Sequence, residues 1–346
     1  MSFLKRFFKN VIHDRDVDDE TVKVKGKPKP KYYGTIAEYP NFSASSDASV
    51  LQKAIRDDKV DEDVIVSVLV KRSNDQRQKI KVVYEASDEE RLDEALKSAL
   101  RSDLEDVTLA LLMTPAHFDA YELRQATKGL GTDEDVLTEI LATRTNEEIQ
   151  EIKRVYKEVY ERELAEVIED ETSGDFTTAL LALLKAEKDE SDEVNDDLVR
   201  KDAETLFEAA EHPDGIDVRA FIDILTSRNH KQLSKTFQRY ALGSDMTLPK
   251  ALDMELRGDI EDCLIDIVKC AWNTPAFFAE KLHKAMEGHG TCEETLIRVL
   301  VSRSEKDLKK IIQEYRDMYG VRLQDSIVND TEGHYRAVLL GLCGPF

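Results

Sequence analysis

Residues 127–156 read TKGLGTDEDVLTEILATRTNEEIQEIKRVY, and parts of this stretch recur in three other places along the chain. An Arg twelve residues before a Tyr marks each copy, and two further positions keep the same spacing between copies. The three series are Arg72/Tyr84, Arg144/Tyr156, Arg228/Tyr240 and Arg303/Tyr315; Lys59, Gly131, Gly215 and Gly290; and Ser102, Gly174, Gly258 and Gly333. A period this long indicates four stacked supersecondary units that share a core.

Composition predicts an all-α protein. The 346 residues are 41% hydrophobic and include only 14 Gly and 8 Pro. Long stretches rich in Leu, Ala, Glu and Lys favour helices, and the hydrophobic periodicity predicts about five helices in each unit. We expect an N-terminal arm at 1–45, repeats at 46–113, 114–186, 197–272 and 273–346, and an acidic, solvated linker at 187–196.

Net charge limits the partners. The chain carries 71 acidic and 49 basic side chains, a net charge of −22. Nucleic acid and anionic membranes would therefore repel the protein as a whole. We expect no nucleic-acid partner, and any contact with an anionic membrane requires a bridging cation.

Cysteine usage and the lack of targeting signals favour a cytoplasmic protein. None of the four Cys forms a CxxC pair, and a reduced compartment is the simpler interpretation. Residues 1–10 are too few and too charged for a signal peptide. No apolar run approaches the roughly 20 residues that a membrane span needs.

Two loops in repeat 2 predict a cation site. The glycine turn at 127–132 exposes carbonyl oxygens, and Glu171 follows Gly131 by forty residues. Carbonyls of Thr127, Gly129 and Gly131 with a bidentate Glu171 make a set of oxygens that suits Ca²⁺, which takes about six to eight. Calcium is the best candidate, with positions left for water or phosphate oxygen, because magnesium demands a tighter octahedron.

The helix after this turn should begin near Thr132. Thr132 is a candidate N-cap, with Asp135 three residues later in the place of the capping-box acid. Thr291 and Glu294 repeat the pattern in the fourth unit. Thr132 and Glu134 also count among the candidate metal residues of repeat 2.

The other repeats keep these parts to different degrees. Repeat 4 has all of them, repeat 3 keeps one glycine and its carboxylate, and in repeat 1 Lys59 replaces the glycine and Ala99 the carboxylate. We expect a full site in repeat 4, a looser one in repeat 3 and at most a weak one in repeat 1. Their candidate ligands are Met286, Gly288, Gly290 and Asp330; Ala210, Pro213, Gly215 and Glu255; and Lys59, Val60, Glu62, Leu100 and Glu105, respectively.

Glycine turns of this kind also occur outside metal sites. A single GxGT turn is a weak signal, because a helix C-cap glycine followed by an N-cap gives the same letters. The repeated carboxylate offset favours a metal site over that alternative. No copy continues into the Gly-Lys-Ser/Thr of a P-loop, and no DxDxDG run of an EF-hand occurs. No Ser/His/Asp or Cys/His arrangement clusters, so we do not expect an enzyme.

The N-terminal arm contains a short amphipathic pattern. At 2–12, apolar residues recur at helical spacing opposite basic ones, before a Lys/Pro-rich linker at 23–34. Such a helix could bind in a partner's groove, lie on a membrane or pack on its own core. The candidate contact residues are Phe3, Leu4, Phe7, Phe8, Val11 and Ile12.

The motifs resemble those of the annexin family over about residues 46–346. The resemblance is carried by the GLGTDED and GHGT loops, the carboxylate forty residues further on, and LxxR motifs that end at Arg72, Arg144, Arg228 and Arg303. It implies four repeats in a curved disc that holds calcium on its convex face and binds anionic phospholipid. It also implies a small EF-hand calcium-sensor dimer as a partner of the arm. Thr127 departs from the Met that is usual in the family.

The expected function is calcium-dependent binding of anionic phospholipid membranes. Membrane bridging or aggregation, vesicle trafficking or repair, phospholipase A2 inhibition and anti-inflammatory signalling all remain open as its use. The resemblance implies a cytoplasmic protein that becomes peripheral on membranes when calcium rises, with the nucleus, plasma membrane, endosomes and non-classical export as further locations. The alternative is a calcium-independent helical-repeat scaffold for protein interactions, which has no need of the carboxylate offset.

Overall fold

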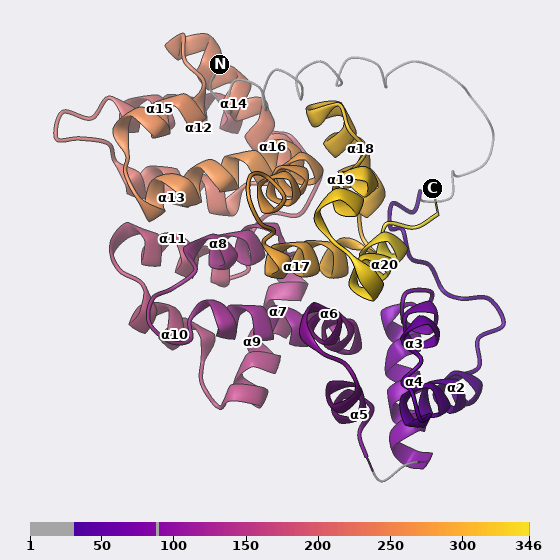
Figure 1. Ribbon diagram of the computed structural model, residues 1–346. Coiled ribbons are helices and arrows are strands. Elements are labelled where there is room, and N and C mark those ends of the chain that lie inside the picture. Colours follow the sequence, from indigo (N-terminus) through magenta and orange to yellow (C-terminus); the bar gives the residue numbers. More distant parts are fainter. Residues whose placement is uncertain (1–30, 88–89, 346) are drawn as a thin grey trace, which may run out of the picture. The chain divides into compact units, whose positions relative to one another are not determined.

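The computed structural model describes residues 31–87 and 90–345, and every regular element in these ranges is a helix (Figure 1). The predicted all-α class is therefore confirmed. Among the described residues, 31–115 with 278–345 form one compact unit and 116–277 form another. The predicted contact residues of the arm lie outside the described residues: Phe3, Leu4, Phe7, Phe8, Val11 and Ile12.

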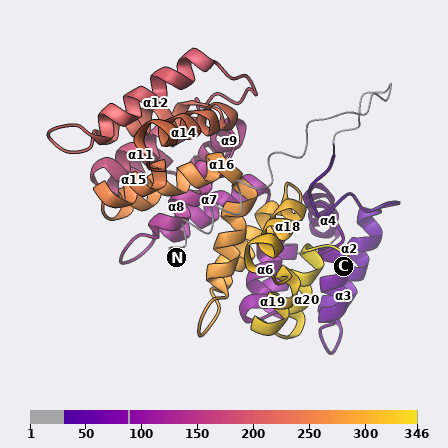
Figure 2. The same cartoon turned by 90° about the horizontal axis from the view of Figure 1, so that it is seen from above.

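The first unit contains repeat 1 and most of repeat 4. Repeat 1 has α2 (Ala44–Arg56), α3 (Glu62–Leu69), α4 (Asn74–Ser87), α5 (Leu92–Ala99) and α6 (Ser102–Leu112). Repeat 4 ends with α17 (Glu293–Arg303), α18 (Leu308–Tyr319), α19 (Leu323–Asp330) and α20 (Gly333–Leu342). Within repeat 1, α2 packs against α3 and α4, and the two views show these helices side by side (Figures 1 and 2).

The second unit contains nearly all of repeat 2 and the whole of repeat 3. Repeat 2 has α7 (Pro115–Ala126), α8 (Glu134–Thr143), α9 (Asn146–Tyr160), α10 (Leu164–Glu171) and α11 (Gly174–Leu184). Repeat 3 has α12 (Asp196–Ala210), α13 (Val218–Ser227), α14 (His230–Ser244), α15 (Leu248–Glu255) and the start of α16 (Asp259–Ala285).

The long α16 is two helices joined at a kink. Asn273 has non-helical angles, φ −157° and ψ 94°, and its Oδ1 accepts the backbone N–H of Ala276 at 3.0 Å. The side chain therefore acts as an N-cap, and Pro275 lies in the first turn that follows, where its missing N–H costs nothing. Counted as two, α16 gives each repeat five helices within the described residues.

The Arg of the sequence marker anchors each repeat. In three repeats it forms a buried or half-buried ion pair with an Asp on the first helix of the same repeat. In repeat 4 Phe278 stands at the position of that Asp, and Arg303 lies 4.6 Å from its ring and pairs with Asp307 at 2.7 Å instead. The three pairs are Arg72–Asp47, Arg144–Asp119 and Arg228–Asp202, with N–O distances of 2.6, 2.7 and 2.7 Å.

Backbone conformation explains the third marker series, which is Ser102, Gly174, Gly258 and Gly333. Each member begins the last helix of its repeat or, in the case of Gly258, directly precedes it, and each has a left-handed φ, which glycine adopts without steric cost. Ser102 is the member that is not glycine, at φ 54°. The glycines are Gly174, Gly258 and Gly333, at φ 66°, 77° and 64°.

The acidic segment before α12 is exposed but not a free tether. The backbone N–H of Asp189 donates to the carbonyl of Ser227 at 2.9 Å. Its carboxylate accepts from Asn229 Nδ2 at 2.7 Å and from the backbone of Ser191 at 2.9 Å. These hydrogen bonds lower the pKa of Asp189. The segment is exposed to solvent, as predicted for a linker, but its start is fixed to the end of α13.

Candidate calcium sites

The glycine turn of repeat 2 joins the end of α7 to the start of α8. Gly129 and Gly131 both have φ 100°, and nothing lies within 4 Å of a Cβ built on either. Between them Leu130 is fully exposed to solvent. The backbone N–H of Asp133 closes the turn by donating to the carbonyl of Ala126 at 2.8 Å. The conformation is therefore one that glycine favours at two positions, with open space beside it.

The second loop of repeat 2 lies against this turn. Thr132 Oγ1 donates to the carbonyl of Glu171 at 3.1 Å, across 39 residues of sequence. Glu171 is the last residue of α10, and Ala126 is the last residue of α7. Two helices thus end at one place, and the carbonyl ends of helices carry partial negative charge. Helix ends, turn carbonyls and one carboxylate suit a hard cation.

Repeat 4 repeats this geometry. Gly288 and Gly290 each have φ 98°, and the turn is closed by the N–H of Cys292 on the carbonyl of Ala285 at 2.8 Å. Here the Thr291 hydroxyl lies 3.3 Å from the carbonyl oxygen of Asp330 and 3.2 Å from its Oδ2. The carboxylate of the second loop is therefore held beside the glycine turn, and Met286 follows directly on α16.

The predicted N-caps were wrong by one residue. Asp133, not Thr132, caps α8, since its Oδ1 accepts the N–H of Val136 at 3.2 Å. In repeat 4 the N-cap position belongs to Cys292, which makes no capping hydrogen bond, rather than to Thr291. The physical reason is that both threonine hydroxyls donate to the second loop, so the helices start one residue later.

Repeat 3 has a longer turn. Asp217 N–H donates to the carbonyl of Ala209 at 2.9 Å, a closure of eight residues where the other repeats have seven. Gly215 has φ 102°, and Ile216 stands where repeats 2 and 4 have the threonine. Of the predicted ligands, Ala210 ends α12, Pro213 and Gly215 lie in the turn, and Glu255 ends α15.

Repeat 1 offers least to a metal. Lys59 and Val60 lie in the turn, but the Glu62 carboxylate already lies 2.8 Å from His334 Nδ1. The carbonyl of Leu100 accepts from the Arg101 guanidinium at 2.6 Å. Glu105 is half-buried on α6. The structure therefore engages two of the five predicted residues with protein groups.

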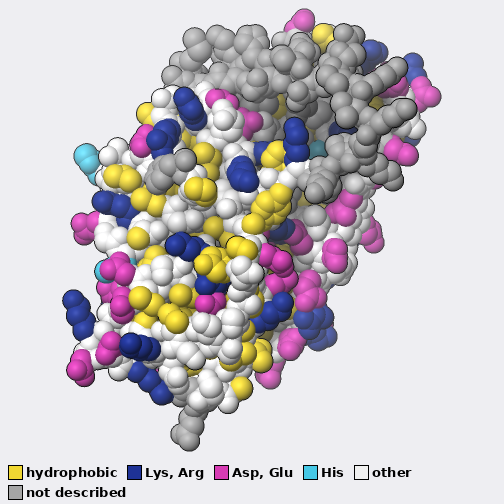
Figure 3. All heavy atoms as spheres, turned by 90° about the vertical axis from the view of Figure 1, so that its right-hand side faces the viewer, with side chains coloured by type: hydrophobic (Ala, Val, Ile, Leu, Met, Phe, Trp, Pro, Cys, Tyr) yellow, Lys and Arg dark blue, Asp and Glu magenta, His cyan; other side chains and the backbone are white. Residues whose placement is uncertain are grey.

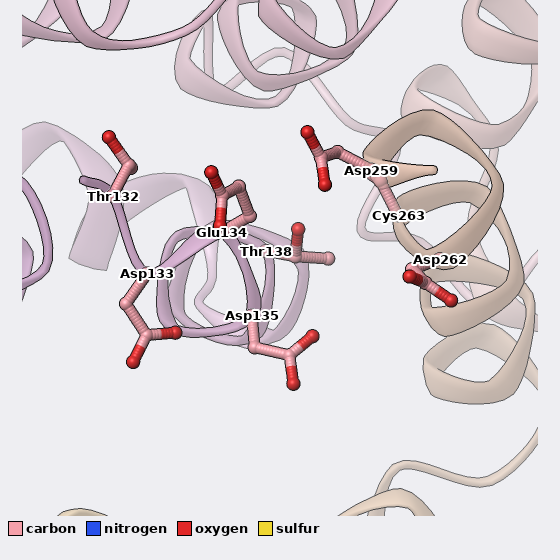
Figure 4. Close-up of a pocket in the computed structure, with 8 residues that line it drawn as sticks. All are labelled: Thr132, Asp133, Glu134, Asp135, Thr138, Asp259, Asp262 and Cys263. Carbon is pink, nitrogen blue, oxygen red and sulfur yellow. The ribbon is translucent and has the colours of Figure 1, made fainter. Parts of the chain in front are cut away.

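Glu134, the other candidate of repeat 2, lines an acidic pocket of about 370 Å³ within its unit. Figure 4 shows side chains of α8 on one side of this pocket and those at the start of α16 on the other. Sequence reasoning found Glu134 and Thr132 but missed Asp259, Asp262 and Cys263, since these three come from repeat 3. The lining residues are Thr132, Asp133, Glu134, Asp135, Thr138, Asp259, Asp262 and Cys263.

Acidic side chains also crowd the repeat 4 site. Burial raises the pKa of Glu293, and the charges of Asp103, Glu294 and Asp330 raise it further, against a lowering hydrogen bond from Tyr335. Tyr335 Oη donates to Glu293 Oε2 at 2.6 Å. A bound cation would reduce this repulsion. The face of the molecule drawn in Figure 3 differs from this acidic cluster, because acidic, basic and hydrophobic side chains are mixed on it.

The ligand sets proposed for calcium rely on main-chain oxygens with one carboxylate. In the described part of the chain, no three His, Cys, Asp or Glu side chains converge to hold a metal. In residues 31–87 and 90–345, no helix has the length and apolar character to cross a membrane.

Comparisons with known proteins agree with the repeat architecture. The annexin family model matches residues 46–111, 118–183, 201–267 and 277–342. Annexin A1 of Cavia cutleri is 50% identical and annexin A1 of Homo sapiens 49% identical, each over 344 residues and 99% of both chains.

The comparison with solved structures also matches annexins. Annexin III has a TM-score of 0.89 at 44% identity, covering 91% of this chain and 98% of its own. Chicken annexin V in complex with Zn²⁺ has a TM-score of 0.86 at 42% identity, covering 91% and 99%. Calcium-bound alpha-14 giardin, at 19% identity and a TM-score of 0.76, shares the fold. The resemblance seen in the loops is thus confirmed, and the chain belongs to the annexin family.

Proposed function

We propose that this chain binds anionic phospholipid membranes through calcium held by the paired loops of repeats 2 and 4. Membership of the annexin family makes calcium-dependent phospholipid binding its general property. The observation that carries the specific proposal is the pair of threonine hydroxyls, which hold each glycine turn against its carboxylate loop.

The proposed ligands are residues that the sequence analysis predicts. In repeat 2 they are the carbonyls of Thr127, Gly129 and Gly131 with Glu171, and in repeat 4 those of Met286, Gly288 and Gly290 with Asp330. Calcium bound there would offer its open positions to lipid phosphate. Without a bound cation, the negative charge of the protein repels anionic lipid, and calcium held in these loops offsets that repulsion. Several weak sites acting together make membrane binding steep in calcium.

The first test is co-sedimentation of the full chain with vesicles across a calcium titration. Vesicles containing phosphatidylserine are compared with pure phosphatidylcholine, and a chelator is added at the end. We expect steep binding to the anionic vesicles alone and release by the chelator. Equal binding with and without calcium would favour the scaffold function, and no binding at millimolar calcium would contradict the proposal.

The arm is proposed to bind a small EF-hand calcium-sensor dimer through Phe3, Leu4, Phe7, Phe8, Val11 and Ile12. Its support is the amphipathic pattern in the sequence, since these residues lie outside the described part. A peptide of residues 1–15 should become helical on binding a calcium-loaded sensor. A peptide that stays unbound with every sensor tried contradicts this partner.

The same chemistry would serve membrane bridging, vesicle trafficking or repair. We propose a non-catalytic protein of the cytoplasm that becomes peripheral on membranes as calcium rises. Phospholipase A2 inhibition would follow from covering the anionic substrate surface. It predicts inhibition that disappears when substrate lipid is in excess, whereas direct inhibition of the enzyme would persist.

A further inference from the structure

An arginine caps the end of α5, the fourth helix of repeat 1. Arg101 Nη1 donates to the carbonyls of Leu100 at 2.6 Å and Ser98 at 2.8 Å, and the carbonyl of Lys97 lies 3.4 Å away. Three main-chain oxygens therefore converge on one cationic group at the carbonyl end of a helix.

Repeat 3 has the same arrangement at the end of α15. Arg257 Nη1 donates to the carbonyl of Asp253 at 2.7 Å and also to that of Leu256. Arg101 and Arg257 hold the same repeat position, since each directly precedes the left-handed residue of the third marker series, Ser102 or Gly258. The two contacts are thus one feature that occurs twice.

Repeats 2 and 4 have no arginine at this position of the repeat. Ser173 and Glu332 stand at the position of the two arginines. The helix-end carbonyls of Glu171 and Asp330 accept threonine hydroxyls instead. The end of the fourth helix therefore receives a threonine hydroxyl in repeats 2 and 4, and the guanidinium of Arg101 or Arg257 in repeats 1 and 3.

The glycine turns also differ between repeats 1 and 3 on the one hand and repeats 2 and 4 on the other. The threonine position holds Val60 in repeat 1 and Ile216 in repeat 3, neither of which has a side-chain donor. Repeat 4 has a different arginine here. Arg336 comes from α20 and donates to the carbonyl of Thr331, which lies one residue beyond α19, as Leu100 and Leu256 lie one residue beyond α5 and α15. Arg101 and Arg257 also reach the carbonyls of Ser98 and Asp253 in the last turn of their helices. Last-turn carbonyls are contacted by arginine in repeats 1 and 3.

A guanidinium at these carbonyls supplies the positive charge that a bound metal ion would supply. The carbonyl end of a helix carries a partial negative charge that a cation stabilises. Arginine stays charged at all physiological pH, so its cation is permanent. A calcium ion at the same oxygens would have to displace the guanidinium or bear its repulsion.

We infer that Arg101 and Arg257 are resident cations that fill the carbonyl ends of α5 and α15 and keep calcium out of the second loops of repeats 1 and 3. This inference rests on the proposed function, because it specifies which repeats respond to calcium. Repeats 1 and 3 carry a fixed charge at the last-turn carbonyls of the fourth helix, while repeats 2 and 4 would acquire theirs from solution.

The test exchanges the arginine for the residue of repeat 2. Arg257→Ser copies Ser173 and leaves Glu255 in place, so it is the sharper variant. Arg101→Ser should have a smaller effect, because Ala99 supplies no carboxylate. Arg257→Lys keeps a cation at the helix end and is the matched control. Equilibrium dialysis with radioactive calcium, without lipid, counts the ions bound by the full chain.

We expect Arg257→Ser to bind one more calcium ion than the wild type at the same free calcium, and Arg257→Lys to match the wild type. Without calcium, Arg257→Ser should unfold at a lower temperature, and calcium should restore more of its melting temperature than it adds to the wild type. An Arg257→Ser variant that binds the same number of calcium ions as the wild type and has the same melting temperature would overturn the inference.

Two further outcomes keep the inference separate from the proposed function. If the wild type binds no calcium, the proposed function fails, whatever the variants do. If the wild type binds calcium and the serine variant gains nothing, the inference alone fails. Should Arg257→Ser not fold, Arg257→Gln keeps the length of the side chain without its charge, and the same ion count decides.

Discussion

Repeats 2 and 3 lie in one compact unit and have the same order of helices, yet their loops differ chemically. In repeat 2 the turn closes over seven residues, and Thr132 ties it to Glu171. In repeat 3 the turn closes over eight, the Ile216 side chain cannot donate, and Arg257 covers the end of α15. The order of helices is therefore the same in both repeats, while the loops differ in turn length, in the residue after the turn glycine and in the group at the end of the fourth helix.

The largest effect should come from removing the carboxylates of the two complete loops. Glu171→Ala with Asp330→Ala is expected to raise the calcium needed for half-maximal binding to phosphatidylserine vesicles at least about tenfold, because each site loses the carboxylate of its second loop and the sites act together. Vesicle co-sedimentation measures this. Glu62→Ala with Glu105→Ala, in repeat 1, is the matched control and should leave the midpoint nearly unchanged. Equal shifts in both double variants would remove the distinction between the repeats.

A backbone change in the turn should come next. Gly131→Ala places a Cβ on a residue with φ 100°, which costs about 1–3 kcal/mol unless the turn rearranges. We expect a lower melting temperature and a weaker response to calcium, both measurable by thermal unfolding. Gly243→Ala in α14 is the control, since that glycine has an ordinary helical setting with open space, and it should be neutral or slightly stabilising. A Gly131→Ala variant as stable and as calcium-responsive as the wild type would show that the turn conformation is not needed.

The threonine link offers a more selective test. Thr132→Val copies Val60 of repeat 1 and removes the hydroxyl at nearly constant volume. Loss of one hydrogen bond worth about 1 kcal/mol should weaken calcium binding in repeat 2 by about three- to fivefold. Thr132→Ser should restore it, because serine keeps the donor. Calorimetric calcium titration in the Asp330→Ala background isolates repeat 2. If the valine and serine variants behave alike, the hydroxyl does not position the second loop.

The smallest effect concerns the acidic surroundings of repeat 4. The raised pKa of Glu293 means that the folded state favours its protonated form. The contribution of Glu293 to stability is therefore present at pH below the ordinary glutamate pKa and is lost as the pH rises through the raised value. Glu293→Gln should raise the calcium-free melting temperature by about 1–2 °C at pH 7 and leave it unchanged near pH 4.

Calcium should reduce that difference, because a cation near Asp330 offsets the same repulsion. The exposed Glu147→Gln on α9 controls for the general loss of one negative charge. Identical melting curves for the two glutamine variants would place the repulsion outside the repeat 4 site.

Much of the fold was predictable because it depends on spacing along the chain. The Arg marker recurs since each repeat needs its anchor, and the glycine series recurs because each last helix starts from a left-handed residue. The partner of the arginine in repeat 4 was not predictable: Phe278 stands at the aspartate position, and Arg303 pairs with Asp307 instead. A local pattern does not show which acid an arginine reaches when the usual one is missing.

The candidate sites divide in the same way. Glycine turns and carboxylates could be located by their offset, and the structure brings Thr132 to Glu171 and Thr291 to Asp330. The caps were misplaced, because a threonine before a helix has a local acceptor role and a long-range donor role, and the sequence shows only the first. The arginine caps of α5 and α15 gave no sequence signal beyond an Arg before the marker residue.

The sequence by itself determined the all-helical class, the four repeats and the two loops that recur with a fixed carboxylate offset. These follow from periodicity and from residue types that only certain backbone conformations accept. The tertiary structure decided which groups meet: hydroxyl with carbonyl across 39 residues in repeats 2 and 4, and guanidinium with the helix end in repeats 1 and 3. Hydrogen bonds act over about 3 Å, so they depend on how helices pack rather than on their order in the chain.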